Sequence, residues 1–368
     1  MDIVFMRIAL VSLSVRGALG QYTEVLVQPL SRKTETHLFV PTHYEGDCGQ
    51  AVLHAFPTGS THSRALLSLL NPLLAWRVWG DIRRIQPDVV HLLTGEGYPW
   101  ALLWAAWAQR QEIPFIVTVH DPERHPGYNL WEILNARLRR FVLGRATGVH
   151  VHSPRFTELI TAQGFRSDNI FVIPHGSLAQ RFLKYRSNAA GGDQAAGGKP
   201  LALFFGRLEA YKGLDLLAEA AFLLNGSIRF AIAGPGHLPP QLEASFRKHP
   251  DLFELHNRYL DDDEVAALFQ RAAVCVLPYL QATQSSVPLI SAAFGVPVVA
   301  TAVGAFIDDV PRVSGILVRP NDAAALAQGI QEALGRKPHY PRELEFDMLV
   351  DHFLKMYRNT IDTSNQGQ

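Results

Sequence analysis

Residues 279–301, YLQATQSSVPLISAAFGVPVVAT, lie within an uncharged run that extends from residue 272 to residue 307. Charged residues make up 18% of the chain, so an uncharged run of this length predicts a buried passage. Pro278, Pro288 and Pro297 interrupt it, together with a polar patch at residues 281–286, so it is not a membrane span. The pattern predicts a strand, a loop, a helix and a second strand.

Short runs of β-branched and other apolar residues recur along the rest of the chain. In the first half they are RIALVSL, THLFVP, AVLHAF, DVVHLL, PFIVTVH, GVHVHS and IFVIPHG. In the second half they are LALFFG, IRFAIAG, LFELHN, VCVLPY, PVVAT and GILVRP. Their continuous apolar character is typical of parallel strands that helices cover on both faces. We therefore expect an α/β fold with two Rossmann-like, doubly wound domains that face each other across a cleft.

The length of 368 residues also favours two domains over one. We expect the first domain over residues 1–180 and the second over residues 200–338. Between them, residues 181–199 form a flexible connection rich in Gly and Ala. An amphipathic helix is expected within residues 339–360, and residues 361–368 are expected to be a disordered tail.

Composition narrows the class of protein. Lys plus Arg and Asp plus Glu number 34 each, so no global field favours nucleic acid as a partner. Cys48 and Cys275 lie far apart and offer neither a disulfide framework nor the spacing of a metal site, which favours a reducing cytoplasm. The apolar start has no basic region before it and no convincing cleavage site after it, so MRIALVSL is predicted to be a first strand rather than a signal peptide.

The stretch FFGRLEAYKGLDLL, residues 204–217, has the composition of a phosphate site. The predicted strand ends at Gly206, Arg207 and Lys212 bracket a short loop, and Gly213 opens an amphipathic helix. Two cations beside a helix N-terminus suit a diphosphate. The alternative is a solvated loop with two ordinary surface cations, and the residues alone leave both interpretations open.

Two other glycine turns follow predicted strands. Gly17 lies in GALGQ and Gly236 in AGPGHLPP, and neither turn completes the G-x-G-x-x-G spacing of a dinucleotide site. Either can be only a tight turn. An oxidoreductase is therefore a distant alternative.

Several motifs occur in the order and spacing of a known family. They are GRLEAYKGLDLLAEA, IAGPG, LHNRYLDDDEVAALFQRAAVCVLPY, FGVPVVATAVGAFIDDV and GILVRPNDAAALAQGIQEAL, and with looser features of the first half they resemble the family-4 (group 1) retaining glycosyltransferases of the GT-B fold. The resemblance implies transfer of a sugar from a nucleoside diphosphate sugar, a co-substrate, to a glycan or glycolipid acceptor, with no cofactor and no metal. It places the donor on the second domain, the acceptor on the first, and the C-terminal helix back across the domain junction.

The resemblance also assigns roles to particular residues. Arg207 and Lys212 match the cations that stabilise the departing diphosphate, and His120, at the end of PFIVTVHD, matches a histidine placed to bond a sugar hydroxyl. The glycines that it places at the donor are Gly17, Gly206 and Gly236.

The opening stretch departs from the family pattern. Many members carry two glutamates separated by seven residues, and here Thr283 and Ser291 stand in their places. The turn Gln284, Ser285 and Ser286 resembles a variant in which N–H and hydroxyl groups bond phosphate or sugar oxygens. Without the carboxylates, an inactive member that binds a nucleotide or a partner transferase is the alternative function, and a buried turn without a chemical role is the alternative structure.

The acidic stretch LDDDEV, residues 260–265, could be taken for an Asp-x-Asp metal motif. It directly precedes the helical pattern AALFQ. Acidic residues at a helix start are typical caps, so we expect a cap here.

Residues 64–85, RALLSLLNPLLAWRVWGDIRRI, combine apolar bulk with two tryptophans and four arginines. This composition suits a helix on the anionic inner face of a membrane. It also suits a core-facing helix with a basic outer side and a break near Pro72, which is the commoner case. We therefore expect a cytoplasmic protein, for which peripheral membrane contact is one interpretation of this segment.

Overall fold

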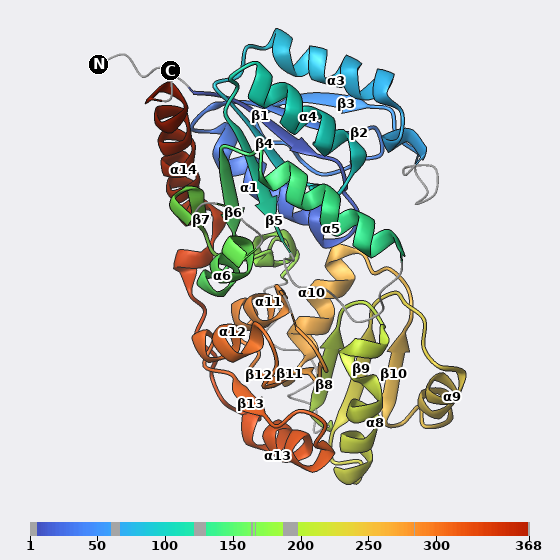
Figure 1. The fold of residues 1–368 in the computed structure, drawn as a ribbon. Coiled ribbons are helices and arrows are strands. Elements are labelled where there is room, and N and C mark those ends of the chain that lie inside the picture. Colours follow the sequence, from blue (N-terminus) through green and yellow to red (C-terminus); the bar gives the residue numbers. More distant parts are fainter. Residues whose placement is uncertain are drawn as a thin grey trace. The chain divides into compact units, whose positions relative to one another are not determined.

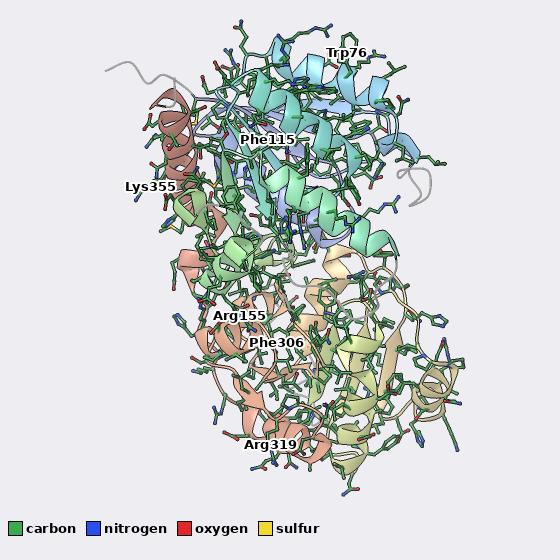
Figure 2. The ribbon with its side chains drawn as sticks, viewed as in Figure 1. Trp76, Phe115, Arg155, Phe306, Arg319 and Lys355 are labelled. Carbon is green, nitrogen blue, oxygen red and sulfur yellow. The ribbon has the colours of Figure 1, made fainter. Side chains whose placement is uncertain are left out.

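The computed structural model describes residues 6–59, 67–120, 130–162, 165, 167–186, 198–282 and 284–366. The chain divides into two compact units. The first unit comprises Met1–Gly176 and Glu343–Gln368, and the second unit comprises Ser177–Arg342. Phe115 is buried in the first unit and Phe306 in the second, and Figure 2 labels both.

The first unit is built on a seven-stranded parallel sheet in the order β3-β2-β1-β4-β5-β6-β7 (Figure 1). Its strands are β1 (Arg7–Ser12), β2 (Glu35–Pro41), β3 (Val52–Phe56), β4 (Val89–Thr94), β5 (Phe115–Val119), β6 (Gly148–Val151) and β7 (Ile170–Val172). Its helices are α1 (Ala18–Ser31), α3 (Pro72–Arg84), α4 (Pro99–Arg110), α5 (Leu130–Leu143), α6 (Pro154–Ala162), the short η1 (Ser167–Asn169) and α14 (Phe346–Gln366).

The second unit is built on a six-stranded parallel sheet in the order β10-β9-β8-β11-β12-β13. Its strands are β8 (Leu201–Phe205), β9 (Arg229–Ala233), β10 (Phe253–His256), β11 (Val274–Leu277), β12 (Val298–Thr301) and β13 (Ile316–Val318). Its helices are α7 (Ala179–Leu183), η3 (Ala210–Lys212), α8 (Leu214–Leu223), α9 (Pro240–Lys248), α10 (Asp262–Arg271), α11 (Val287–Ala293), α12 (Phe306–Arg312) and α13 (Ala323–Ala333), and η4 (Arg342–Leu344) lies at the boundary.

Both sheets have the doubly wound strand order that we expected. Each apolar run quoted from the sequence forms a strand, so the prediction of two Rossmann-like α/β units is confirmed. The strand order reverses beside β1 in the first sheet and beside β8 in the second. In such sheets ligands bind beyond the carboxyl ends of the strands at this reversal. The loops that follow β1 and β4, and those that follow β8 and β11, are therefore where the chemistry of each unit is expected.

The boundaries of the connection and of the C-terminal helix differ from those we expected. The second unit begins at Ser177, and α7 occupies part of the stretch expected as a flexible connection. Residues 187–197 of that stretch lie outside the described residues. Helix α14 continues to Gln366, through residues expected as a disordered tail.

Helix α14 returns to the first unit and packs on α1 (Figure 1). Successive side chains of β4 point to opposite faces of the sheet, and their contacts show which face α14 covers. Val90 and Leu92 join the core formed with α3 and α4, whereas His91 between them contacts Tyr357 of α14. Helices α3 and α4 therefore cover one face of the sheet and α14 covers the other.

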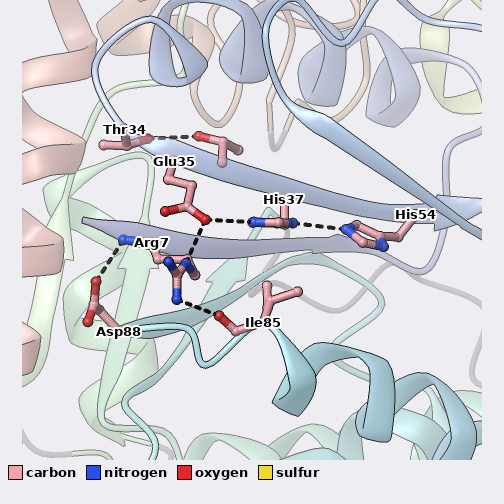
Figure 3. Close-up of polar contacts among 8 residues, drawn as sticks. Arg7, Thr34, Glu35, His37, His54, Ile85 and Asp88 are labelled. Carbon is pink, nitrogen blue, oxygen red and sulfur yellow. Dashed lines mark hydrogen bonds and ion pairs between the residues drawn. The ribbon is translucent and has the colours of Figure 1, made fainter. Parts of the chain in front are cut away.

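A row of polar contacts, which we call the polar ladder, crosses three strands of the first sheet and reaches the end of α3 at Ile85 (Figure 3). His54 Nε2 of β3 lies 2.9 Å from His37 Nδ1 of β2, and His37 Nε2 lies 3.2 Å from the Glu35 carboxylate. Glu35 accepts from Arg7 Nε of β1 at 2.6 Å, and Arg7 Nη1 donates to the Ile85 carbonyl at 2.9 Å. The ladder joins three strands and fixes the C-terminal end of α3 to the sheet.

Candidate functional site

The loop after β8 holds Lys212 in an aromatic environment. The Lys212 side chain is almost fully buried, and Nζ lies 3.6 Å from the centre of the Tyr279 ring and 4.9 Å from that of Tyr211. A cation over the face of a tyrosine ring is attracted to its π electrons. The two rings therefore hold the ammonium group in place at the strand-order reversal of the second sheet.

Burial also changes the acidity of Lys212. Loss of solvation, together with the nearby Arg207 cation, lowers the pKa of Lys212 to about 7, and Glu209 partly opposes this shift. Near neutral pH the unliganded site therefore contains both charged and neutral lysine. An anionic ligand beside Nζ would favour the charged form.

Arg207 lies on the same loop and is much more exposed. Its Nη1 forms a 2.8 Å ion pair with Glu209 Oε1, and about two thirds of its side chain, 65%, is exposed. An exposed ion pair of this kind is weak, so a diphosphate could draw the guanidinium away from Glu209. Arg207 and Lys212 therefore come together on one loop, as the sequence predicted, but in different environments.

The loop after β11 docks on the loop after β8. The Leu280 N–H donates to the Tyr211 carbonyl at 2.8 Å, and Tyr279 supplies one ring of the lysine site. Gly213 makes this approach possible, because a Cβ atom there would lie 2.0 Å from the Pro278 carbonyl oxygen. Its φ of +68° is also in the left-handed region that favours glycine.

The matched glycines Gly213 and Gly226 allow a test of this docking. Gly226 has nearly the same φ, +69°, but among the described residues a Cβ there would meet only the flexible end of Lys199 at 3.6 Å. We expect Gly226→Ala to cost about 1 kcal/mol of stability, and Gly213→Ala about 2 kcal/mol more because the Pro278 loop must move. Far-ultraviolet circular dichroism during urea unfolding measures both. Equal losses in the two variants would show that the close approach is not required.

The turn after β11 is only partly described. Gln284, Ser285 and Ser286 are half-buried, and Ser285 Oγ accepts from the Val287 N–H at 3.4 Å. Thr283, which we placed in the donor site, lies outside the described residues.

Ser291 lies in α11, away from solvent. It is fully buried, and its hydroxyl donates to the Val296 carbonyl at 2.8 Å. That bond joins the end of α11 to the chain that enters β12. In this structure the Ser291 hydroxyl is thus occupied by the backbone, whereas the resemblance places a donor contact there.

Two of the predicted glycines lie where the loops after β8 and β9 meet. A Cβ on Gly236 would lie 2.3 Å from the Leu208 carbonyl oxygen, so the close approach of two backbones requires glycine there. The Gly236 N–H is itself bonded to Asn257 Oδ1 at 3.1 Å. Gly206 has a φ of +143°, and among the described residues only the Tyr279 hydroxyl, at 3.6 Å, lies near the position that a Cβ would take. Gly206 therefore leaves space beside the lysine site, and Gly236 shapes the adjoining loop.

In the first unit, Gly17 lies at the predicted ligand edge. It has a φ of +55°, it directly precedes α1, and a Cβ there would meet no atom of the described residues within 4 Å. Its carbonyl accepts from the N–H groups of Gly20 and Gln21 at 3.1 and 3.2 Å. Gly17 therefore opens the first helix beside the strand-order reversal.

His120 follows β5, and the protein already bonds both of its ring nitrogens. Nε2 lies 2.9 Å from the Leu93 carbonyl, and Nδ1 lies 3.0 Å from His152 Nε2. Because a carbonyl only accepts, the proton of a neutral His120 lies on Nε2, and His152 donates to Nδ1. A sugar hydroxyl that bonds His120 must therefore share or displace one of these partners.

A chain of hydrogen bonds under α14 continues this polar cluster. The Tyr357 hydroxyl, His91, Thr118, His150 and the Ile173 carbonyl are joined in sequence at 2.8, 2.8, 2.9 and 3.1 Å. Because the chain ends on a carbonyl, each neutral group donates to the next, and no protonated histidine is needed. His152 Nδ1 also lies 3.3 Å from that carbonyl, but its shorter contact with His120 fixes the proton on Nε2.

The pKa values of these histidines are lowered mainly by burial. The pKa falls to about 3 for His120 and to about 4 for His150 and for His175, whose ring centre lies 5.0 Å from that of His152. For His91 and His152 the pKa is also well below the usual value. Removal of water disfavours the charged imidazolium, and neighbouring histidines repel a second charge. At neutral pH this cluster is therefore uncharged.

The sequence did not identify three aromatic residues of these sites. Tyr211 and Tyr279 enclose Lys212, and Tyr22 of α1 contacts the rings of His120 and His152 at centroid distances of 5.0 and 5.6 Å. The contacts of Tyr279 and Tyr22 join segments that are distant in the chain, whereas Tyr211 directly precedes Lys212. For the histidine cluster that Tyr22 contacts, the sequence offered the HxH pattern at the end of β6, which places His150 and His152 on one side of the chain.

The acidic stretch is a helix cap, as expected. Asp261 accepts from the first turn of α10, and Glu264 bonds back to the Asp261 N–H in a capping box. Asp262 pairs with Arg181 at 2.9 Å. Among the described residues no group of His, Cys, Asp and Glu side chains is arranged to hold a metal ion. Within the same ranges no helix has the length and apolar character of a membrane span.

Comparison with known proteins covers both halves of the chain. Residues 17–176 match the glycosyl transferase 4-like domain, and residues 199–336 match the glycosyl transferases group 1 family. A glycogen synthase of Mycobacterium tuberculosis is 29% identical over 69% of this chain and 62% of its own length. A D-inositol 3-phosphate glycosyltransferase of Pseudarthrobacter chlorophenolicus is 30% identical over 70% of this chain and 65% of its own length. The chain thus spans less than two thirds of either relative.

Solved structures share the fold over nearly the whole chain. Sucrose-phosphate synthase of Thermosynechococcus elongatus superposes with a TM-score of 0.68 at 19% identity and covers 97% of this chain and 94% of its own. Anabaena HepE in complex with UDP-glucose superposes with a TM-score of 0.66 at 15% identity and covers 98% of each chain. At these identities the likeness concerns the fold.

Proposed function

This chain belongs to the group 1 glycosyltransferases, and we propose that it transfers a sugar from a nucleoside diphosphate sugar to an acceptor. The observation that carries the proposal is the cation pair Arg207 and Lys212 on the loop after β8. This loop lies at the strand-order reversal of the second sheet, where doubly wound folds bind nucleotides.

The two cations would act on the leaving group. Negative charge develops on the diphosphate as its bond to the sugar breaks, and cations already in position stabilise that charge without reorganisation. Lys212 is fixed by Tyr211 and Tyr279, whereas Arg207 can move from Glu209 to the phosphate. We propose that these side chains make a metal ion unnecessary.

Further aspects of the proposal rest on family membership. We propose retention of the anomeric configuration, donor binding on the second unit, and acceptor binding on the first. A polysaccharide or lipid-linked glycan is the proposed acceptor, supported by a relative that is a glycogen synthase. The proposed place of reaction is the cytoplasm, at the inner face of a membrane.

The His120→Ala variant tests whether the first unit contributes to the reaction. We expect His120→Ala to lower the release of nucleoside diphosphate from the correct donor by about a hundredfold, because the reacting sugar loses a positioning contact. A panel of nucleotide sugars with bacterial membrane lipids as acceptors provides the assay. His54→Ala is the matched control, since His54 belongs to the separate ladder on β3.

Tryptophan fluorescence monitors folding in both variants, because all six tryptophans lie in the first unit. Release that falls only in folded His120→Ala supports the proposed site. An equal rate in wild type and His120→Ala removes His120 from it.

A second candidate is a catalytically inactive member that binds a nucleotide or a partner transferase. Two observations favour it: neither glutamate position carries a carboxylate, and the Ser291 hydroxyl is bonded to the backbone. This candidate predicts nucleotide binding that weakens in Lys212→Ala, with no diphosphate release from any donor and acceptor.

A further inference from the structure

Helix α3 presents large apolar side chains to solvent. Leu73 is 76% exposed, Trp76 68% and the preceding Leu70 56%. Figure 2 shows Trp76 on the outer side of α3, pointing away from the sheet. The inner face of the helix is occupied by Ala75, Val78, Trp79 and Ile82, which are buried in the core. The outer apolar residues are therefore additional to those that fold the unit.

Arginines share this outer face. Helical spacing places Arg77 and Arg84 on the same side as Leu73, and Arg83 beside Trp76. Arg84 pairs with Asp81, the only carboxylate within α3, at 2.5 Å. Arg77 and Arg83 have no ion-pair partner in the described part of the chain. The face therefore carries unneutralised positive charge next to its apolar end.

The helix is held firmly on its inner side. The Trp100 and Trp104 indole N–H groups of α4 donate to the carbonyls of Asn71 and Ala75 at 3.1 and 3.0 Å. The Asn71 side chain caps the first turn, and the polar ladder holds the other end through the Ile85 carbonyl. The outer side chains thus project from a fixed platform, and a partner can bind them without unfolding α3.

We propose that this outer face of α3 docks the first unit on an anionic membrane surface. Leu73 and Trp76 enter the boundary between headgroups and acyl chains, and Arg77 and Arg83 contact lipid phosphates. This docking extends the proposed function, because it names the surface at which the protein would meet a lipid-linked acceptor. Its purpose rests on that proposed function. The docking itself needs no nucleotide sugar.

A second copy of the chain fits this face less well. In an antiparallel two-fold pair the apolar first half of one α3 would face the arginine-rich second half of the other, and in a parallel pair the arginines would face each other. Their unpaired arginines would then lose water without gaining a carboxylate. A membrane surface matches both halves of α3 at once, because lipid phosphates can contact the arginines and acyl chains can contact the apolar side chains.

Vesicle binding of the full chain tests the proposal without nucleotide sugar. We expect co-sedimentation with vesicles of equal parts phosphatidylcholine and phosphatidylglycerol, little with phosphatidylcholine alone, and weaker binding at high salt. Leu73→Ser with Trp76→Ser should lower the partition coefficient by at least about tenfold. Arg77→Gln and Arg83→Gln should each lower it by about fivefold.

Matched substitutions on the second unit serve as controls. Phe222 and Leu223 are 44% and 55% exposed on α8, so Phe222→Ser with Leu223→Ser removes comparable apolar surface. Trp76→Phe should keep binding and lose the blue shift of fluorescence that vesicles cause in the wild type. Binding that the α3 and α8 variants reduce equally, or a concentration-dependent dimer that Leu73→Ser dissolves, would overturn the proposal. Diphosphate release measured without vesicles tests the proposed function separately.

Discussion

Replacing Lys212 by alanine is expected to lower the rate of nucleoside diphosphate release by about a hundredfold to a thousandfold. The substitution removes a cation that Tyr211 and Tyr279 hold where charge develops on the leaving group. Arg207 cannot replace it fully, because it is mostly exposed and shared with Glu209. Loss of one fixed charge in a site shielded from water accounts for an effect of this size.

Steady-state kinetics with the donor identified in the panel measure this effect. Lys212→Met keeps most of the buried volume and separates loss of charge from a cavity. Lys184→Ala is the control, since Lys184 also lies over a tyrosine, Tyr185, at 5.1 Å but on the surface. Near-normal turnover in folded Lys212→Met would remove Lys212 from the catalytic site.

The pH dependence of diphosphate binding tests the role of Lys212 in a second way. Because the pKa of Lys212 is about 7 in the free protein, the charged form becomes scarce as pH rises above 7. A diphosphate that binds the charged form should then lose about tenfold in affinity for each pH unit. It should also bind with uptake of a proton near neutral pH, and Lys212→Met should bind with neither effect.

Acid is expected to unfold the first unit before the second. Folding holds the pKa of His120 at about 3 and of His150 and His175 at about 4, below the unfolded value of about 6.5. Below pH 6.5 the unfolded chain therefore binds more protons than the folded chain, so stability is retained above that pH and lost as pH falls toward 4. Each of these histidines should cost about 2 kcal/mol between pH 7 and pH 5.

Urea unfolding followed by tryptophan fluorescence measures this loss in the first unit alone. The slope of the unfolding free energy against pH counts the protons taken up. His175→Gln should reduce that count by about one, whatever its effect on stability at neutral pH. The control His352→Asn replaces a histidine at an exposed position of α14, outside the buried cluster. An equal slope in wild type and His175→Gln would contradict the role given to the buried cluster.

The strands were predictable because each is a short, continuous apolar run. Buried parallel strands need such runs, as in VCVLPY and PVVAT, and their order follows from the connections between them. The end of α14 was not predictable, since NTIDTSNQ is polar and has no helical stripe. In the structure these residues extend the helix begun by the amphipathic stretch before them.

The sequence predicted the part of the candidate site that lies within one loop, because the residue types of that loop alone indicate its chemistry. Arg207 and Lys212 come together because the chain itself joins them. The Tyr279 ring reaches Lys212 only through tertiary packing of the β11 loop, so spacing along the chain gave no sign of it. The family resemblance placed Ser291 at the donor without indicating that its hydroxyl bonds the Val296 carbonyl.

The return of α14 to the first unit also determines the order in which the molecule can be completed during synthesis. The ribosome makes residues 177–342, and with them the whole second unit, before it makes α14. Until then the sheet face that carries His91 and His150 lacks its cover, and Tyr357 is not there to bond His91. The first unit, whose synthesis begins first, is therefore completed after the second unit. Nascent chains are most exposed to aggregation and proteolysis in this interval.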